Sequence, residues 1–381
     1  MNLIESKLPK VGTTIFTTMG KLAYQYDAVN LSQGFPNFNA DSKLLKLVQE
    51  AISEGYNQYA PMQGIYSLRE IISEKIENLY GHSYNPENEI TITASATQGI
   101  FTAISTFVKP NDEVIIFKPA YDCYEPAITL CGGVIVPIQL LDADFKIDWE
   151  NFKAAITPKT KMVIINTPHN PTGTILSEQD MLKLQYILED TNIILLSDEV
   201  YEHLVFDGKT HESAAKFQGL ASRSILCASF GKTFHVTGWK MGYCAAPKEL
   251  MLEFRKVHQY VVFCVNHPVQ HGVAQYLKNP KNYIGLNTFY QQKRDYFLNA
   301  IQNSRFKISP CTGTYFQILD YSSITDENDI SFAERLIKEY KIASIPISVF
   351  NLDNQDNKQL RFCFAKTEET LDKAAEILNR I

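Results

Sequence analysis

The sequence predicts an α/β protein that has a mostly parallel sheet in a large domain and a smaller α+β domain after it. Through the middle of the chain, short apolar runs alternate with longer helical patterns. Several of these runs are continuously apolar, which is typical of strands that helices cover on both faces. The last third changes character, and 381 residues are enough for two domains that share an interface.

The expected strands of the large domain are short apolar runs. They cover Ile90–Thr93, Glu113–Phe117, Gly133–Ile138, Met162–Asn166, Ile193–Ser197 and Ser224–Ala228. Helical patterns lie between most of them, for example at Thr97–Val108, Tyr121–Cys131 and Glu178–Asp190. Strands and helices in alternation indicate crossover connections and therefore parallel strands.

The smaller domain is expected to begin within a long helical stretch that runs from about Pro268 to Ser304. The elements expected after it are a strand Gly313–Leu319, a helix Ser331–Tyr340, a short strand around Ser344–Pro346, a strand Gln359–Ala365 and a helix Thr367–Arg380. The N-terminal segment shows no sheet pattern of its own. The expected division is therefore 1–35 as an N-terminal part of the small domain, 36–280 as the large domain and 281–381 as the small C-terminal domain.

Charge and composition exclude several classes of partner. The formal net charge of −6 and the lack of a long basic block argue against nucleic acid. No apolar run reaches the roughly 20 residues of a membrane helix, and the first residues lack the apolar stretch of a secretory signal. The 7 cysteines are scattered, so we expect reduced thiols in a cytoplasmic protein and no metal site.

Polar and aromatic residues follow the expected strands where the strands end. In an open parallel sheet, ligands bind beyond these carboxyl ends. Ala96 and Thr97 open a helix there, and the backbone N–H groups of a helix start suit a phosphate. An ordinary helix cap explains this turn about equally well.

The other strand ends carry different chemistry. Tyr121 follows the next strand, although a core or capping role would normally explain such a tyrosine. Two prolines make the loop around Asn170 rigid. Asp198 ends an apolar strand, where a carboxylate is costly unless it has a cationic partner. The remaining residues at this edge are Tyr201, Ser229, Lys232 and Lys240. A planar, phosphorylated nitrogen heterocycle that carries an aldehyde would engage all of these groups.

Several motifs resemble those of the pyridoxal-phosphate-dependent aminotransferases of classes I and II, which have fold type I. They are Leu31–Pro36, Tyr121–Tyr124, Gly231–Lys240 and Leu360–Phe364, and they are similar to the kynurenine aminotransferase / glutamine transaminase K branch. Lys256–Tyr260, Val265–Asn266 and Ile345–Phe350 resemble the bacterial methionine aminotransferases of that branch. The resemblance covers nearly the whole chain and implies a seven-stranded sheet.

The resemblance implies a role for each residue around pyridoxal 5'-phosphate (PLP). Lys232 matches the lysine that bonds the cofactor's aldehyde and later moves a proton. Asp198 matches the partner of the ring nitrogen. Asn170 and Tyr201 match donors to the phenolic oxygen. Tyr121 matches the residue stacked on the ring, where this branch often has Phe.

The resemblance also implies how the phosphate is held. Ala96 and Thr97 would offer backbone N–H groups, and Ser229 and Lys240 would add side chains; many aminotransferases have Arg in place of this lysine. Tyr59 resembles a tyrosine that reaches the phosphate of the neighbouring subunit, which implies a homodimer with shared active sites.

Substrate recognition is implied to depend on Arg361, because a guanidinium holds a carboxylate through two parallel hydrogen bonds. Asn170 would contribute to the substrate site, and Gly34 would offer backbone contact. Phe16 matches a position where kynurenine-type enzymes often have Trp, which implies an apolar, reshaped pocket. Asn266 and Tyr66 are weaker candidates to line it.

The resemblance implies ping-pong amino transfer from methionine and other apolar or aromatic amino acids, with glutamine or kynurenine as further donors, to a 2-oxo acid. A carbon–sulfur β-lyase that acts on cysteine conjugates is the alternative, because it would use every cofactor residue. A non-catalytic PLP-binding module is a third reading, which the presence of Lys232, Asp198 and Arg361 disfavours.

Overall fold

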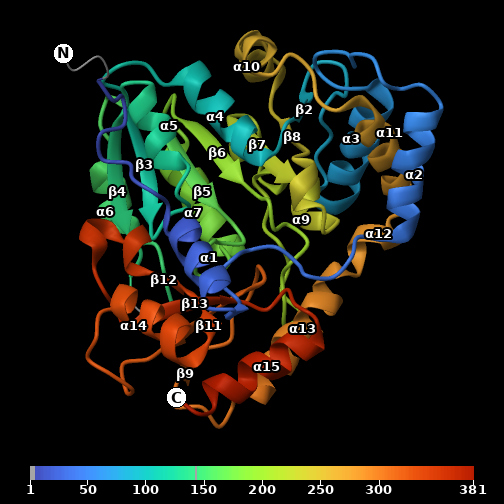
Figure 1. Ribbon diagram of the computed structural model, residues 1–381. Helices are drawn as coiled ribbons and strands as arrows, with labels where there is room; N and C mark the ends of the chain where they lie inside the picture. The colour runs from blue at the N-terminus through green and yellow to red at the C-terminus, as the bar shows by residue number, and fades with distance from the viewer. Residues whose placement is uncertain (1–4, 142–143) are drawn as a thin grey trace.

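The computed structural model describes residues 5–141 and 144–381. Figure 1 shows a large sheet with helices on both faces and the C-terminal elements gathered at one end of it. The N-terminal helix α1 (Ile15–Gln25) lies beside these C-terminal elements. Within the described residues, no helix is both long and apolar enough to cross a membrane.

The large sheet has seven strands in the order β2-β8-β7-β6-β5-β3-β4. Their bounds are β2 Ile90–Thr93, β3 Glu113–Lys118, β4 Val134–Gln139, β5 Thr160–Asn166, β6 Ile194–Asp198, β7 Ser224–Ser229 and β8 Gly242–Ala245. The strands from β7 to β4 pair in parallel, whereas β8 is antiparallel to β7 and β2. The expected α/β class and mostly parallel sheet of fold type I are therefore confirmed.

Strand β8 was missing from the six expected strands. Its sequence, Gly-Tyr-Cys-Ala, has no β-branched residue and is too short to show a pattern. It is nevertheless buried along its whole length, between β2 and β7. This strand therefore forms because the neighbouring strands bury it, and the strand preference of its own four residues does not account for it.

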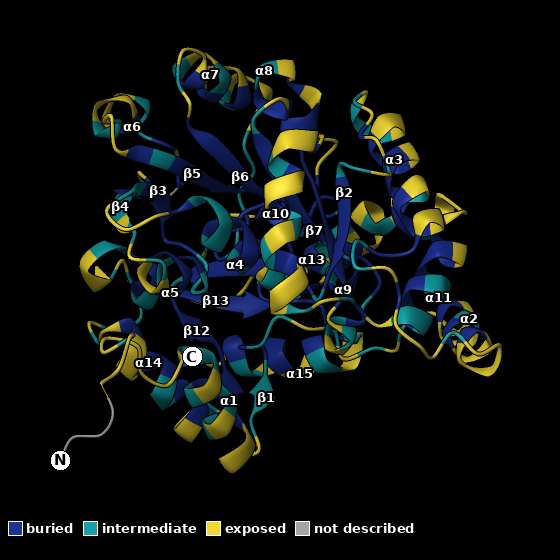
Figure 2. Ribbon diagram, turned by 90° about the horizontal axis from the view of Figure 1, so that it is seen from above, coloured by how far each residue is buried: buried dark blue, intermediate teal, exposed yellow. Residues whose placement is uncertain are grey.

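The parallel strands alternate between two cores, which explains their continuous apolar sequences. Ile164 of β5 packs in the core beneath α4 (Ala96–Phe107) and α5 (Tyr124–Leu130). Val163 and Ile165 pack in the core beneath α6 (Trp149–Ala155) and α7 (Glu178–Leu188). Helix α10 (Lys248–Val261) covers the first core. Figure 2 shows the strands buried under helices such as α10, whose outward residues are exposed. A two-sided core fixes the strand positions, and hence the positions of the residues that follow them.

The helices of this part of the chain have the following bounds: α2 Ser42–Ser53, α3 Tyr66–Tyr80, α4 Ala96–Phe107, α5 Tyr124–Leu130, α6 Trp149–Ala155, α7 Glu178–Leu188, α8 Gln218–Ala221, α9 Phe230–Thr233, α10 Lys248–Val261, α11 His267–Leu277 and α12 Lys281–Ile284. Helix α5 begins at Tyr124, three residues after the predicted start. Tyr121 therefore lies in the loop before it.

The second part is an antiparallel sheet with helices around it. Its elements are β9 Lys307–Ile308, β10 Phe316–Asp320, β12 Ile345–Pro346, β13 Gln359–Cys363, α13 Leu286–Ala300, α14 Asp329–Arg335 and α15 Glu368–Leu378, with strand order β12-β13-β10-β9. The N-terminal segment does contain a strand, contrary to expectation. This strand, β1 (Val29–Asn30), pairs in parallel with β11 (Ile342–Ala343), and two residues are too few to show a sequence pattern.

Two expected helices are broken. The stretch from 268 to 304 forms α11, α12 and α13, because Pro280 caps α12 and Gly285 separates α12 from α13. The helix expected to end at Tyr340 finishes in a wider π-helical turn, Leu336–Tyr340, after which Lys341 has a left-handed φ of 61°. All seven cysteines are free, and four of them are buried.

Candidate active site

The residues predicted to hold the cofactor meet in one cavity at the carboxyl edge of the large sheet. The cavity is lined by Ala96, Thr97, Tyr121, Asn170, Asp198, Tyr201, Ser229, Lys232 and Lys240, together with Ser95, Ile100, Asn166, Val200, Gly231, Thr237 and Met241. Of the predicted cofactor residues, Tyr59 alone is absent. Strand register explains the convergence, since β5 pairs Asn166 with Asp198 of β6.

The start of α4 is built to leave backbone N–H groups available. Ser95 has a left-handed φ of 81°, and its side chain makes no cap hydrogen bond to the helix. Gly242 of β8 lies against this turn, where a Cβ would come within 3.0 Å of the Ala96 nitrogen. Ser229 and Lys240 line the same cavity. These donors fit a phosphate dianion.

Asp198 is a fully buried carboxylate at the end of β6. The Tyr124 hydroxyl donates to its Oδ2 at 2.6 Å, and the Val200 N–H donates to its Oδ1 at 3.3 Å. Burial raises the pKa of Asp198 to about 6, and the hydrogen bond from Tyr124 opposes this rise. Asp198 lines the cavity, where a cationic N–H partner would offset the cost of its burial.

Asn170 is fixed from both sides. Its backbone N–H donates to Asn166 Oδ1 at 2.8 Å, and the Asn166 side chain donates to the carbonyl of Asp198 at 2.9 Å. Its own Oδ1 accepts from Arg361 Nη1 at 2.6 Å. The prolines alone were expected to hold this residue, but Asn166 ties the loop directly to β6.

Lys232 lies on α9 with its ammonium inside the cavity. Nζ donates to the carbonyl of Gly34 at 3.2 Å and to the hydroxyl of Tyr315 at 3.0 Å. Burial lowers the pKa of Lys232 to about 8. A neutral amine is therefore accessible near physiological pH, which both covalent chemistry and proton transfer require.

The rings of Tyr201 and Tyr315 each lie 5.6 Å from Lys232 Nζ, measured to the ring centroid. Tyr201 is buried, and its ring meets Tyr315 edge-on at 5.2 Å. Burial raises the pKa of Tyr201, so its hydroxyl stays protonated. Tyr121 also lines the cavity, and its ring meets Tyr124 edge-on at 5.9 Å.

Arg361, on β13, is 1% exposed. Its Nη2 donates to the carbonyl of Ser32 at 3.1 Å, and its Nε has no hydrogen-bond partner among the described residues. The guanidinium lies 3.9 Å from the Phe316 ring centroid and 5.2 Å from that of Phe16. Burial lowers the pKa of this arginine, and an anion would offset that cost. The surroundings fit a carboxylate attached to an apolar group.

Gly34 and Phe16 come from the N-terminal segment. A Cβ on Gly34 would lie 2.5 Å from Phe316 Cζ, so a larger residue would displace the chain that presents its carbonyl to Lys232. Phe16 packs against Phe350 at 5.8 Å. Both predicted substrate residues therefore lie beside Arg361 or Lys232.

Tyr59 lies away from the cavity of its own chain. It is 81% exposed and meets Phe263 edge-on at 5.4 Å. Its contact with a neighbouring subunit remains a prediction. Asn266 caps α11 by accepting from the Val269 N–H, and neither it nor Tyr66 lines this cavity.

Sequence reasoning missed Asn166, Tyr124 and Tyr315. Asn166 ends a predicted strand, so its position was a usable signal. Tyr124 follows Tyr121 by three positions within the same motif and could have been considered with it. Tyr315 comes from the other end of the chain, and nothing in the sequence links it to Lys232.

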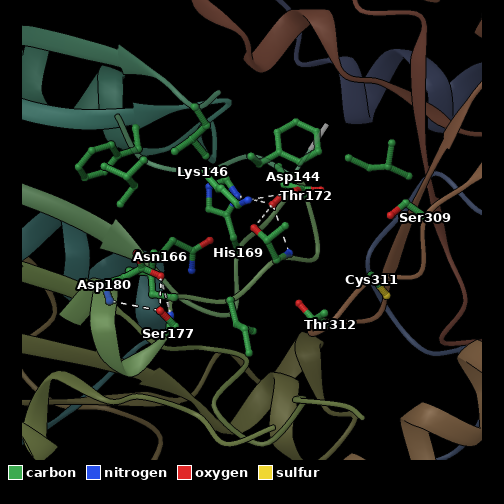
Figure 3. A pocket seen from close by; sticks show the side chains of 18 of the residues that line it. Asp144, Lys146, Asn166, His169, Thr172, Ser177, Asp180, Ser309, Cys311 and Thr312 are labelled. Atoms are coloured by element: carbon green, nitrogen blue, oxygen red, sulfur yellow. Dashed lines mark hydrogen bonds and ion pairs between the residues drawn. The ribbon is translucent and has the colours of Figure 1, made fainter. Parts of the chain in front are cut away.

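A larger cavity of about 660 Å³ shares Asn166 with this site. Figure 3 shows its polar walls, which include His169 and Thr172, joined by a 2.7 Å hydrogen bond, and Ser309 and Thr312 from the second part of the chain. Lys232 and Asp198 line only the smaller cavity. Arg361 lines neither cavity, and it is connected to the smaller one through its hydrogen bond to Asn170.

Comparisons with known proteins agree with this geometry. The profile of the family described as aminotransferase class I and II matches residues 26–378. Methionine aminotransferase of Escherichia coli is 46% identical over 378 residues, which cover 99% of this chain and 98% of that protein. Kynurenine–oxoglutarate transaminase of Dictyostelium discoideum is 34% identical, with 97% and 94% covered.

Solved structures resemble the chain along its whole length. A crystal structure from Escherichia coli, reported with a methionine aminotransferase function, has a TM-score of 0.98 and 45% identity, and each chain is covered completely. The N-succinyldiaminopimelate aminotransferase of Mycobacterium tuberculosis has a TM-score of 0.95 and 35% identity, with 99% of both chains covered.

Proposed function

The chain belongs to the PLP-dependent aminotransferases of classes I and II, and from this premise we propose that it transfers the α-amino group of methionine to a 2-oxo acid. Other apolar and aromatic amino acids, kynurenine and glutamine included, are proposed as further donors. The observation that carries the proposal is Arg361, whose buried guanidinium lacks a partner at Nε and lies between Phe16 and Phe316. A carboxylate beside an apolar side chain satisfies both features.

The donor groups of the cavity suit each part of PLP. The N–H groups at the start of α4, with Ser229 and Lys240, would hold the phosphate. Asp198 would accept from the ring nitrogen. The other proposed partners are Lys232 for the aldehyde, Asn170 and Tyr201 for the phenolic oxygen, and Tyr121 for the ring face. Bound PLP supplies an electron sink for the charge left when the α-proton departs.

The chain's own residues supply positioning and proton transfer. Arg361 and Asn170 hold the substrate carboxylate, which aligns the Cα–H bond with Lys232. Lys232, whose pKa of about 8 keeps a useful fraction neutral, takes the α-proton and returns it later. Since one pocket serves donor and acceptor in turn, we expect ping-pong kinetics.

We further propose a homodimer with shared active sites. Tyr59 and Tyr260 are 81% and 86% exposed, and Val261 and Phe263 are exposed as well. Tyr59 packs on Phe263, and this pair is the apolar surface that a second copy would cover. Tyr59 would then reach the phosphate of the partner's site. The free cysteines suit the cytoplasm, which is the proposed location.

We propose that residues 1–35 belong with 281–381 and that 36–280 form the other domain. The pairing of β1 with β11 supports this division, as does the hydrogen bond from Arg361 to the Ser32 carbonyl. Helix α1 adds Met19 and Ala23 to the core that α15 covers.

The β-lyase alternative gains no support from the relatives, whose names describe amino transfer. The third reading, a non-catalytic PLP-binding module, disagrees with the same names. A panel of amino donors, tested in single half-reactions by the absorbance of the cofactor, decides the donor preference. Methionine and aromatic donors should convert the cofactor faster than aspartate does. Faster release of pyruvate and thiol from a cysteine conjugate than amino transfer would overturn the proposal.

A further inference from the structure

We propose that His267 and His271 form a binding site for a divalent transition-metal ion, and that Cu²⁺ binds more tightly than Ni²⁺ or Zn²⁺. The two residues lie four positions apart on α11, so they share one face of the helix. The sequence alone predicted no metal ligands, because its cysteines are scattered. The site is separate from the cavity that contains Lys232.

The spacing of the two imidazoles matches a chelating pair. Their Nε2 atoms are 3.2 Å apart, and their ring centroids are 5.0 Å apart. Two imidazoles that bind one ion at about 2.05 Å, with an N–metal–N angle of about 100°, have nitrogens roughly 3.2 Å and centroids roughly 5.0 Å apart. Both separations therefore fit nitrogens that converge on a single ion.

The surroundings fix the tautomer that a metal requires. Nδ1 of His267 lies 2.8 Å from the carbonyl oxygen of Gln58. A carbonyl only accepts, so Nδ1 is the donor in this contact, and Nε2 is the nitrogen left to bind an ion. Metal-bound histidines commonly make this second hydrogen bond.

The orientation of His271 is also fixed. Its ring stacks on Tyr56 with centroids 3.6 Å apart, and Tyr56 meets His267 edge-on at 5.6 Å. The same tyrosine therefore holds both imidazole rings in place.

Two imidazoles leave the other coordination positions to water or small ligands, since no group of three metal-binding side chains occurs in the described part of the chain. Nitrogen donors favour Cu²⁺ in the general order of divalent affinities. Without an ion, one Nε2–H would simply donate to the other Nε2. That hydrogen-bonded pair is the rival state.

An ion at this position has a consequence for the proposed dimer. Gln58, which orients His267, directly precedes Tyr59. A bound ion would restrain the segment from Tyr56 to Tyr59. This segment includes Tyr59, whose side chain is proposed to enter the neighbouring subunit. This consequence depends on the proposed dimer, whereas the binding of the ion does not.

The test is titration of the PLP-loaded full chain, without an affinity tag, with Cu²⁺, Ni²⁺ and Zn²⁺ against a competing chelator. The expected result is one Cu²⁺ per chain, with two nitrogen ligands in its electron paramagnetic resonance spectrum. His267→Ala and His271→Ala should each weaken binding at least about tenfold. The matched control is His82→Ala, because His82 also packs on a tyrosine, at 4.6 Å, and should leave binding unchanged.

Several outcomes overturn the proposal. One is the absence of stoichiometric binding, and another is equal affinity in the wild type and both α11 variants. Unchanged melting temperatures of the variants exclude misfolding as the cause of lost binding. A spectrum with a single nitrogen ligand would mean that the two histidines do not chelate the ion together, and the hydrogen-bonded pair would be the correct description of them.

A different set of contacts carries a second inference: Tyr315 is a positioning residue for Lys232. This inference rests on the proposed role of Lys232. Tyr315 is completely buried, and its hydroxyl donates to the Gly34 carbonyl at 2.6 Å. The phenolic oxygen is then left to accept from Lys232 Nζ at 3.0 Å.

These bonds decide where the lysine lone pair points. A neutral amine has two N–H bonds and one lone pair. Tyr315 and the Gly34 carbonyl accept from Nζ at 3.0 and 3.2 Å, so they occupy both N–H bonds. The lone pair is left free to take the α-proton.

Tyr315→Phe removes only the hydroxyl. The α-proton transfer should slow about tenfold, with a larger deuterium isotope effect from Cα-deuterated donor and unchanged donor affinity. In the cofactor-free full chain, the pKa of Lys232, read from its reactivity toward an amine reagent, should fall because an acceptor that favours the ammonium form is lost. The inference is wrong if the rate, the isotope effect and the pKa all match the wild type. If Lys232→Ala kept covalent cofactor, the proposed function itself would fail.

Discussion

The hydroxyl of Tyr124 donates to the Asp198 carboxylate at 2.6 Å, inside a fully buried site. Burial alone would favour the neutral acid, and this bond favours the anion. Asp198 consequently reaches a pKa of about 6 and is mostly ionised at pH 7. The negative charge proposed to pair with the ring nitrogen is therefore present before PLP binds.

Tyr124→Phe should raise the pKa of Asp198, because it removes a hydrogen bond that stabilises the carboxylate. A bond to a charged group is worth about 1.5–3 kcal/mol, or roughly one to two pH units. The affinity of the cofactor-free chain for PLP should fall as the pH is lowered, and in the variant this fall should begin at a correspondingly higher pH. Tyr121→Phe is the control, since it leaves the Tyr124–Asp198 bond in place. If the affinity for PLP falls at the same pH in the variant and the wild type, Tyr124 does not determine the charge of Asp198.

Lys232→Ala should abolish the coloured covalent complex with PLP and slow α-proton removal about 10³-fold or more, because both covalent attachment and proton transfer depend on this amine. Absorbance spectra and the exchange of the α-proton with deuterated solvent measure the two losses separately. Lys209→Ala changes an exposed lysine instead and should alter neither. Covalent colour in the Lys232 variant would refute the assignment.

Arg361→Lys should lower kcat/KM about 30- to 150-fold, which corresponds to roughly 2–3 kcal/mol for the loss of paired hydrogen bonds to the carboxylate. A lysine keeps the charge but cannot make the bidentate contact. A slow amine donor without a carboxylate should be affected far less than methionine. Equal losses for the two donors would mean that Arg361 acts through stability, which thermal unfolding would reveal.

Lys75→Met should destabilise the fold by about 3–5 kcal/mol, because it leaves the buried Glu202 without its counter-ion. The two side chains form a 2.7 Å ion pair, and Tyr80 and Tyr243 also donate to Glu202. Denaturant unfolding measures the loss. Lys75→Met combined with Glu202→Gln should recover most of the stability.

The same pair gives a dependence on pH. Burial opposes ionisation of Glu202, but Lys75 and His203 outweigh it, and the pKa of Glu202 falls to about 2. The pKa of Glu202 is near 4.5 in the unfolded chain, so the ionised side chain stabilises the fold above that pH. This contribution is lost as the pH falls toward 2. The wild type should therefore lose stability over this range, whereas the double variant should lose less.

The sequence predicted residues at the ends of buried strands better than residues that arrive from elsewhere. Asp198 could be placed because an apolar run leads to it, and Asn170 because two prolines surround it. The bond between Tyr315 and Gly34 spans 281 positions, and no local pattern encodes it. Strand β8 escaped prediction for a related reason, since its burial comes from its neighbours.

The N-terminal segment lies between β11 and β13, so one side of the site can assemble only after the end of the chain has been synthesised. Residues 95–241 supply the groups proposed to face PLP, and they are complete when nearly two-thirds of the protein has left the ribosome. The proposed carboxylate-binding side combines Ser32 and Gly34 from the first part with Arg361 from near the end. A nascent chain could therefore acquire affinity for the cofactor well before it acquires affinity for any amino acid.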